Sequence, residues 1–405
     1  MAPVTITTSL SAETIMPKSI SAPRVLLALI ALHACTTGDI QFGDVGPGGP
    51  GRLVIIGGAL QADNAIVYQA VVEARAGGGP LCVVPTASSD PAESMAGAVQ
   101  RLAEYAGVGS VKGILISTED PARAQDPSVV AELAACSGFY FTGGSQSRIV
   151  DVFLPAGDTT EAYRAVKQRW QEGAVVAGSS AGAAMMSRVM ISGGSSAEAV
   201  SYGVADDQDA DGVQIRQGMG FFEPLLDQHF LARGRIGRLL ISVIQTDLPQ
   251  VGLGIDENTA LIVDGDSAVV VGASGVIVVD GRTASRTAAH RASELTVSLA
   301  GAGDVIDLRT LEIRVPSDKR AVPIVDQSVE LPEDPFARWA FLHLVAGLAR
   351  SSAREATFDL SDATLRVVKD AGFSASMVES TGGVEMTPMG LSAGPFRVDL
   401  LPSGS

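Results

Sequence analysis

The sequence predicts an α/β fold, with a mostly parallel sheet flanked by helices and a smaller C-terminal α+β region. Short β-branched runs alternate with Ala-rich runs of helical length, the pattern of successive βαβ units. The first of these short runs, residues 53–56, is apolar throughout, as expected for a strand buried on both faces of a parallel sheet. Hydrophobic residues make up 46% of the chain, which is enough to build such a core and argues against disorder.

The expected elements of the first half follow one another in regular order. Strands are predicted at residues 53–56, 81–85, 111–116, 139–142 and 174–177. Helices are predicted at residues 62–76, 92–106, 129–135 and 159–172. In such sheets, functional residues collect on loops at the carboxyl ends of strands. Three motifs fall on that edge, at residues 143–146, 178–182 and 254–258.

The pattern changes after residue 260. Three β-like runs separated by Gly/Asp turns predict an antiparallel edge, at residues 261–263, 268–271 and 276–279. Beyond residue 285, short strands are expected at residues 295–299, 305–308, 311–315 and 322–325, and a helix at residues 336–350. That last part carries no chemical motif. We therefore expect a catalytic domain at 52–285 and a C-terminal accessory region of unknown role at 286–405.

The first 51 residues are expected to form a leader and a tether. Lys18 and Arg24 precede a short apolar run at 25–32, and the run ends in a sequence similar to a bacterial lipobox, with lipid on Cys35. This makes residues 1–35 a signal or lipoprotein leader, and the Gly/Pro-rich residues 36–51 a tether. Plain signal-peptide cleavage and a disordered tail are the alternatives. We expect an exported protein, either lipid-anchored to the bacterial membrane or secreted.

Charge and cysteine content exclude some classes of protein. A net charge of −16 makes nucleic acid an unsuitable partner and could favour a cationic substrate, although acidity also serves solubility. Three cysteines do not make a disulfide scaffold. Cys82 and Cys136 lie in apolar runs and are expected to be buried small hydrophobes, although a bridge between them is an alternative.

Ser180 is the expected nucleophile. It is the centre of Gly178-Ser179-Ser180-Ala181-Gly182, which follows a predicted strand and precedes a helix-compatible run. This is the nucleophile-elbow pattern, in which flanking glycines permit a sharp turn. The Ala181 N–H at the helix start is expected to stabilise an oxyanion, with Gly144 of a neighbouring loop as the second donor. Ser179 is the neighbouring candidate.

A base and a carboxylate should accompany this serine. Of the four histidines, His33 lies in the leader, His290 in a polar stretch and His343 on the apolar face of a predicted helix. His229 is left by elimination as the base, with a structural histidine as the alternative. Residues 254–258 offer two carboxylates, Asp256 and Glu257, and their spacing does not choose between them.

With these pieces in place, the chain resembles the cyanophycinase family, serine peptidases related to peptidase E. The resemblance covers roughly residues 52–282. It rests on Gly57-Gly58, Phe141-Thr142-Gly143-Gly144-x-Gln146, residues 178–183, Gly218-x-Gly220-Phe221, Asp227-Gln228-His229-Phe230-x-x-Arg233-x-Arg235-x-x-Arg238-Leu239 and residues 254–260. The long string that begins at Asp227 is highly specific.

The resemblance implies a sheet like that of class I glutamine amidotransferases and a triad of Ser180, His229 and Glu257, which favours Glu257 over Asp256. Family members cleave cyanophycin, a poly-aspartate with arginine on its β-carboxyls, to β-Asp-Arg dipeptides. The positions that match the family's substrate site are Gln146, Asp227, Gln228, Arg233, Arg235 and Arg238. Taken without the resemblance, the three arginines would be interpreted as a solvated helix face. Ser145 replaces the usual aspartate, which puts the substrate preference in question.

These observations predict a serine-type peptidase that hydrolyses cyanophycin. The alternatives are an exopeptidase for short aspartyl or isoaspartyl peptides and a non-catalytic binding lipoprotein. No cofactor and no metal are expected. The loop at 207–212 is similar to the start of a calcium loop, but Gly218 stands where the bidentate glutamate belongs. The sequence leaves a homodimer open.

Overall fold

The structure, a computed structural model, describes residues 50–205, 210–245, 247–288, 290–325, 329–378 and 390–403. The chain divides into two compact units, residues 1–41 and 42–405, and every described residue belongs to the second. The predicted leader, Cys35 and most of the predicted tether lie outside the described residues. Within the described ranges, no helix is long and apolar enough to cross a bilayer.

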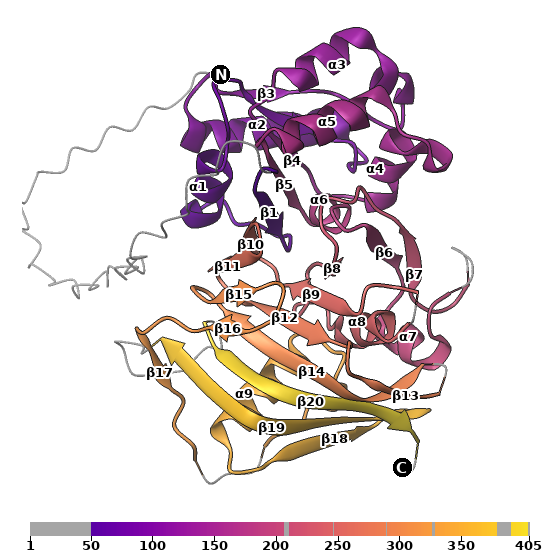
Figure 1. Ribbon diagram of the computed structural model, residues 1–405, viewed down its shortest axis with the longest axis vertical. Coiled ribbons are helices and arrows are strands. Elements are labelled where there is room, and N and C mark those ends of the chain that lie inside the picture. The colour runs from indigo at the N-terminus through magenta and orange to yellow at the C-terminus, as the bar shows by residue number, and fades with distance from the viewer. Residues whose placement is uncertain are drawn as a thin grey trace, which may run out of the picture. The chain divides into compact units, whose positions relative to one another are not determined.

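The first sheet joins a parallel half to an antiparallel half (Figure 1). The parallel strands, in spatial order, are β1 (Leu53–Ile56), β5 (Val175–Ser179), β4 (Gly138–Phe141), β2 (Leu81–Val84) and β3 (Val111–Gly113). Beyond β1, the sheet continues antiparallel through β10 (Thr259–Asp264), β11 (Ser267–Gly272), β15 (Val305–Asp307) and β16 (Ile313–Arg314). The strands β1, β2 and β4 are buried along their whole length, as their unbroken apolar sequences require.

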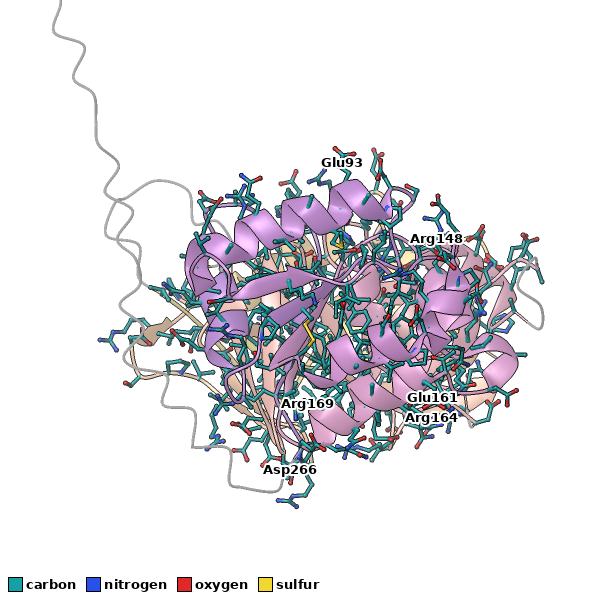
Figure 2. All side chains as sticks on the ribbon, turned by 90° about the horizontal axis from the view of Figure 1, so that it is seen from above. Glu93, Arg148, Glu161, Arg164, Arg169 and Asp266 are labelled. Atoms are coloured by element: carbon teal, nitrogen blue, oxygen red, sulfur yellow. A yellow bond between two sulfur atoms is a disulfide. The ribbon has the colours of Figure 1, made fainter. Side chains whose placement is uncertain are left out.

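Helices connect the parallel strands, and local sequence explains where several of them begin. They are α1 (Ala65–Glu73), α2 (Pro91–Ala106), α3 (Pro127–Ala134), α4 (Gln146–Phe153), α5 (Glu161–Gln171) and α6 (Ala181–Ala184), with 3-10 turns at Pro121–Gln125 and Pro155–Gly157. Asp90 caps α2 by accepting from the Glu93 N–H, and proline follows as the first helical residue. On α5, Glu161 pairs with Arg164 at the surface (Figure 2).

The second sheet is antiparallel except for its last pair. Its order is β17 (Lys319–Ala321), β19 (Ala363–Val378), β20 (Ser392–Pro402), β14 (Arg291–Gly301), β12 (Gly275–Asp280), β9 (Val251–Ile255) and β8 (Leu225–Asp227), with β13 (Ser285–Ala288) on β14 and β18 (Glu355–Asp359) on β19. The helices α8 (Ile236–Val243) and α9 (Ala340–Arg350) contribute to one apolar core with its strands. The strands β6 (Val189–Gly193) and β7 (Gln214–Gln217) form a separate two-stranded sheet, and α7 (Ser196–Tyr202) lies between them in sequence.

The α/β class and the predicted order of strands and helices in the first half are confirmed. Antiparallel strands make up more of the structure than expected. The reason is that β18, β19 and β20 lie in a part of the sequence where no strand was predicted. The strand predicted at 322–325 is wrong, since β17 ends at Ala321. The predicted helix at 336–350 begins only at Ala340, because Trp339 has a left-handed backbone with φ 56°. His343 is exposed on that helix, so its expected burial is also wrong.

Cys82 and Cys136 form a disulfide, which corrects the expectation of two separate buried thiols. Cys82 lies on β2, and Cys136 lies two residues before β4, the strand that pairs with β2. Adjacent parallel strands therefore bring together two residues that are 54 positions apart in sequence. Both side chains are fully buried, as expected.

The domain boundary predicted after residue 285 falls within β13. The strands β12 and β14 lie on opposite sides of this boundary, and they pair along their length from Gly275↔Gly301 to Asp280↔Thr296. Strands of the predicted catalytic domain and of the predicted accessory region thus share one sheet.

Candidate active site

A sharp turn between β5 and α6 presents Ser180. Its backbone has φ 55° and ψ −109°, which residues with a side chain rarely adopt. The flanking positions have no room for a side chain, because a Cβ at Gly178 would lie 2.2 Å from the Gly182 oxygen, and one at Gly182 would lie 2.3 Å from the Phe141 oxygen. The Ser180 N–H donates to the Ile56 oxygen at 2.9 Å, which ties the turn to β1. The expected strand–turn–helix is therefore present.

His229 follows β8 and places its imidazole against this serine. Its Nε2 lies 2.9 Å from Ser180 Oγ. The backbone of His229 is left-handed, with φ 48°, and its N–H donates to the Gly57 oxygen at 2.6 Å. The ring covers Gly58, where a Cβ would lie 2.3 Å from Nε2. The two glycines after β1 thus position the histidine, a role that the sequence reasoning missed although the pair stands at a strand's carboxyl end.

The two carboxylates that spacing could not separate have different surroundings. Glu257 Oε1 lies 2.7 Å from His229 Nδ1. Asp256 is buried, and its carboxylate accepts hydrogen bonds from the Ala232 N–H and the Ser274 hydroxyl, both at 2.8 Å. Glu257 is therefore placed to orient the imidazole, whereas Asp256 holds the backbone that follows His229.

Asn258 fixes the turn that carries Glu257. It has a left-handed backbone, φ 54°, and its N–H donates to the Gly58 oxygen at 2.8 Å. The Asn64 side chain donates to the backbone oxygen of Asn258 at 2.9 Å and to its side-chain oxygen at 2.8 Å. The Gln61 N–H donates to the same side-chain oxygen at 3.0 Å. Sequence reasoning missed Asn64, because no motif links it to residues almost 200 positions away.

The surroundings of His229 keep it uncharged at neutral pH. Burial lowers the pKa of the imidazole, the hydrogen bond with Glu257 opposes this, and the positive charge of Arg233 lowers the pKa further. A neutral ring that donates from Nδ1 to Glu257 has a free lone pair on Nε2. The ring can therefore accept the Ser180 proton.

Backbone N–H groups on two segments flank Ser180. Ala181 is the first residue of α6, so its N–H has no partner inside the helix. Gly143 adjoins the nucleophile, since a Cβ there would lie 3.5 Å from the Ser180 Cβ. Gly144 has φ 142° and no room for a side chain beside Ala87. Among the described residues, no backbone hydrogen bond uses the N–H of Ala181, Gly143 or Gly144. The expected donors are available, and Gly143 joins them.

Three of the six predicted substrate-binding residues form a cluster behind the site. Asp227 and Arg238 make a buried two-pronged ion pair, with Nε 2.7 Å from Oδ2. Arg235 donates to the Gln228 backbone oxygen at 2.6 Å, and burial lowers its pKa to about 10, so that it stays a cation at neutral pH. This arrangement stabilises the end of β8, and gives no support to direct substrate contact by Asp227 or Arg238.

The other three predicted residues differ in their access to a ligand. Gln146 is buried, and its amide donates to the Ile191 oxygen at 2.9 Å. The Gln228 side-chain oxygen lies 3.4 Å from Ser180 Oγ. The Arg233 side chain is 53% exposed, with Nε 3.9 Å from Glu257 Oε1. Gln228 and Arg233 are therefore the two that adjoin the nucleophile and its partners.

Within the described ranges, no group of three or more His, Cys, Asp and Glu side chains is arranged to hold a metal ion. Part of the calcium-like loop, residues 206–209, lies outside those ranges.

Comparisons with known proteins point to one family. The model of peptidase family S51 matches residues 53–271. The cyanophycinase of Synechococcus elongatus is 30% identical over 279 residues, which cover 66% of this chain and 82% of that protein. The cyanophycinase of a Nostoc strain is 32% identical over 233 residues, covering 56% and 73%. Among solved structures, a peptidase from an acI-B1 actinobacterium matches with a TM-score of 0.47 and 22% identity, covering 64% of this chain and 98% of that one.

A hydroxyl, an imidazole and a carboxylate in hydrogen-bonded sequence at a sheet edge are the features of a serine hydrolase. The family model spans more than half of the chain. The chain belongs to peptidase family S51, and it is a serine-type peptidase.

Proposed function

We propose that this peptidase hydrolyses cyanophycin to β-Asp-Arg dipeptides through an acyl-enzyme on Ser180. The observation that carries the mechanism is the hydrogen-bonded chain from Ser180 through His229 to Glu257, with distances of 2.9 and 2.7 Å. The support for the substrate comes from relatives named cyanophycinases at 30% and 32% identity.

In the first half of the reaction, Ser180 Oγ attacks the carbonyl carbon of the main-chain amide between two aspartates. His229 Nε2 takes the hydroxyl proton, and Glu257 stabilises the imidazolium through Nδ1–H. The N–H groups of Ala181 and of the Gly143-Gly144 turn stabilise the oxyanion. The C–N bond then breaks, and the imidazolium gives its proton to the leaving amine.

In the second half, water replaces the amine. His229, again neutral, takes a proton from the water as the oxygen attacks the acyl carbon, and the imidazolium returns this proton to Ser180 Oγ as the C–Oγ bond of the tetrahedral intermediate breaks. Arg233 is exposed beside the reacting groups, where its guanidinium can bind a substrate carboxylate.

Release of β-Asp-Arg from purified cyanophycin tests this proposal. We expect release by the wild type and a fall of at least about 10³-fold in Ser180→Ala. Ser179→Ala is the matched control, because Ser179 is the adjacent serine and ends β5; it should retain most of the activity. The proposal is wrong if the wild type releases no dipeptide, or if Ser180→Ala remains active.

A second candidate is an exopeptidase that acts on short aspartyl or isoaspartyl peptides. Ser145 favours it, because this residue precedes α4 without capping the helix through its side chain, and it leaves the nearby loop without the acid usual in the family. Hydrolysis of a dipeptide panel without release from the polymer would favour this candidate. Ser145→Asp should then move activity toward the polymer.

We also infer that the protein is exported, as the predicted leader at 1–35 requires. The Cys82–Cys136 disulfide supports this, because disulfides persist in oxidising compartments. Expression of the full chain in a bacterium fed labelled palmitate should give a labelled membrane-bound protein, and Cys35→Ala should lose the label. Unlabelled protein in the cytosol with reduced Cys82 and Cys136 would contradict export.

A further inference from the structure

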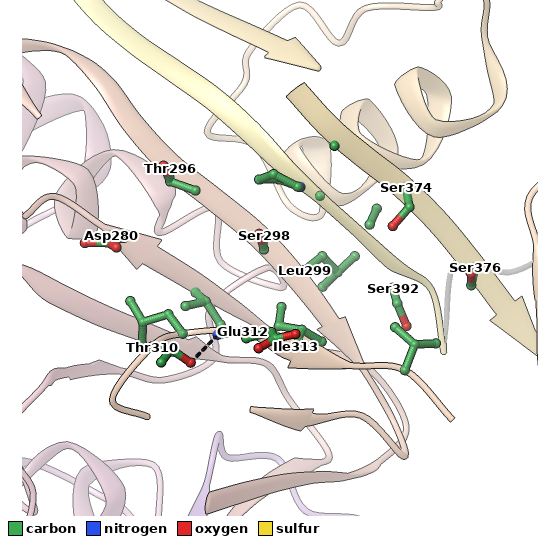
Figure 3. A pocket seen from close by; sticks show the side chains of 17 residues that line it. Asp280, Thr296, Ser298, Leu299, Thr310, Glu312, Ile313, Ser374, Ser376 and Ser392 are labelled. Carbon is green, nitrogen blue, oxygen red and sulfur yellow. Dashed lines mark hydrogen bonds between the residues drawn. The ribbon is translucent and has the colours of Figure 1, made fainter. Parts of the chain in front are cut away.

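A cavity of about 320 Å³ lies outside the candidate active site, between the second sheet and the segment around β16 (Figure 3). Strands β12, β14, β19 and β20 form one side of it, and residues 310–315 contribute to the other. Its polar lining is rich in hydroxyl groups, those of Thr296, Ser298, Thr310, Ser374, Ser376 and Ser392. Figure 3 shows Thr310, Glu312 and Ile313 facing the side that carries Ser374, Ser376 and Ser392.

Pairing of the strands fixes the positions of the hydroxyl-bearing residues in the sheet. Ser298 lies opposite Val278 on β12, and Thr296 lies opposite Asp280. On β19, Ser376 lies opposite Ser392 of β20. Ser392 accepts a hydrogen bond from the buried Lys319 ammonium at 2.8 Å, so this part of the wall is held by its own network. The hydroxyls of Thr296, Ser298, Ser374 and Ser376 make no side-chain hydrogen bond among the described residues and are available to a ligand.

The segment that completes the cavity is also held in place. The Asp307 carboxylate accepts from the N–H groups of Arg309 and Thr310, at 3.0 and 2.9 Å. The Leu311 N–H donates to the Asp307 backbone oxygen at 2.7 Å, and the Asp307 N–H donates to the Glu312 oxygen at 3.0 Å. A cavity whose walls are fixed beforehand costs little ordering of the protein when a ligand binds.

The charge of the lining is negative. It includes two carboxylates, Asp280 and Glu312, and no lysine or arginine. Asp280 is already neutralised, because both of its oxygens accept hydrogen bonds from Arg282 at 2.9 and 2.7 Å. Glu312 has no ion-pair partner among the described residues, and its side chain is exposed. Glu312 is thus the uncompensated charge of the cavity.

We propose that this cavity binds a guanidinium-bearing side chain, that of an arginyl residue. The guanidinium presents five N–H donors in one plane, which suits a carboxylate together with several neutral hydroxyl acceptors. The three-carbon stem of arginine needs an apolar wall, and Leu299, Leu311, Ile313 and Val315 supply one. A ligand without positive charge would leave Glu312 unpaired.

The position of the cavity suits a second contact with a polymeric substrate, and this part of the inference rests on the proposed function. The strand β12 connects the two sites: the Gly275 oxygen accepts from the Asp256 N–H at 3.2 Å, and Asp280 lines the cavity five residues further along. At about 3.3 Å per residue, β12 covers roughly 16 Å over that stretch. A chain that repeats arginine along its length could occupy both sites, whereas a dipeptide could not.

Calorimetric titration of the Ser180→Ala protein with N-acetyl-arginine amide tests the site itself. The probes are this compound and N-acetyl-citrulline amide, its uncharged isostere. We expect the arginine compound to bind and the citrulline compound not to bind. Glu312→Gln, in the same background, should weaken binding at least about fivefold, because it removes a charge-assisted hydrogen bond. Ser374→Leu should also weaken it, because the larger side chain fills the cavity.

Glu93→Gln is the matched control, since Glu93 is an exposed glutamate at the start of α2 and does not line the cavity. It should bind the arginine compound as the parent does, and melting curves should show that all three variants are folded. Absence of binding, equal binding of the citrulline compound, or binding that neither Glu312→Gln nor Ser374→Leu weakens would overturn the proposal. If the site binds arginine but cyanophycin is not hydrolysed, only the proposed function fails.

Discussion

Asp256 and Glu257 are adjacent acids with different surroundings. Sequence spacing left both open as the partner of His229, and only the family resemblance favoured Glu257. The structure separates them by environment, since Asp256 is buried against the Ala232 N–H and Ser274, whereas Glu257 reaches the imidazole. Side-chain direction in a tight turn depends on both flanking loops, and residue order does not encode it.

Alanine substitutions at these two positions should therefore affect different properties, catalytic activity at Glu257 and stability at Asp256. Glu257→Ala should lower kcat by about 10²–10⁴, because the imidazole loses its orienting acceptor, with little change in stability. Asp256→Ala leaves the buried Ala232 N–H unpaired and should lower the free energy of unfolding by about 2 kcal/mol. Steady-state kinetics and urea unfolding measure the two effects. An Asp256→Ala variant that is stable but inactive would show that Asp256, and not Glu257, orients His229.

The acid limb of the pH–rate profile should reflect the protonation of His229. Only its neutral form accepts the Ser180 proton, so kcat/KM should fall as the pH drops through the pKa of His229, which burial places below the usual 6.5 or so. Arg233→Gln removes a positive charge that lowers this pKa. The pKa should rise, and the acid limb should move to higher pH. A limb that stays in place, or moves to lower pH, would contradict this electrostatic account.

At the scale of elements, the loops at strand ends were easier to predict than the sheet as a whole. The motifs after β1, β4 and β5 come together because these parallel strands end at a common edge of the first sheet. The motif after β9 was expected on the same edge, but β9 belongs to the second sheet, and the Asn258 N–H joins it to the turn after β1 through the Gly58 oxygen. The strands β18, β19 and β20 were missed, since β19 carries polar residues and a register shift between Lys369 and Ser374 that interrupt its alternation. The disulfide was left open because it depends on which strands are neighbours.

Gly58 gives a direct test of how the turn after β1 positions His229. In Gly58→Ala, the new methyl group would occupy the place of the imidazole, and we expect activity to fall at least about 10²-fold. Gly77→Ala is the matched control, because Gly77 also has a positive φ, 82°, but nothing within 4 Å of an added Cβ. Both changes carry a backbone cost of about 1–2 kcal/mol. Equal loss of activity in the two variants would show that backbone strain, and not the contact with His229, is responsible.

At the scale of the whole molecule, the sequence suggested a catalytic domain with an accessory region after residue 285. A change in residue pattern along the sequence does not reveal which strands pair. Here β14 pairs with β12 across the expected boundary. The core of the second sheet draws side chains from both sides of that boundary, including Leu239 of α8 and Phe396 of β20. The C-terminal strands are thus part of the sheet that carries β8 and β9, whose ends present His229 and Glu257.

A chain that ends at residue 285 should therefore not fold. It lacks the partner of β12 and a large part of the apolar core that covers α8. We expect an insoluble product, or a soluble one without a cooperative thermal transition and without activity. Circular dichroism melting and a hydrolysis assay measure this, with the full chain as control. A truncated protein that melts cooperatively and remains active would restore the two-domain interpretation.

The central claim is that His229 and Glu257 activate Ser180, and labelling with a fluorophosphonate followed by peptide mapping tests it most directly. We predict a single adduct on Ser180 that is absent from Ser180→Ala, slowed at least about 10²-fold in Glu257→Gln, and unchanged in Ser179→Ala. An adduct on Ser179, or labelling of Ser180 at the same rate without the Glu257 carboxylate, would contradict the account.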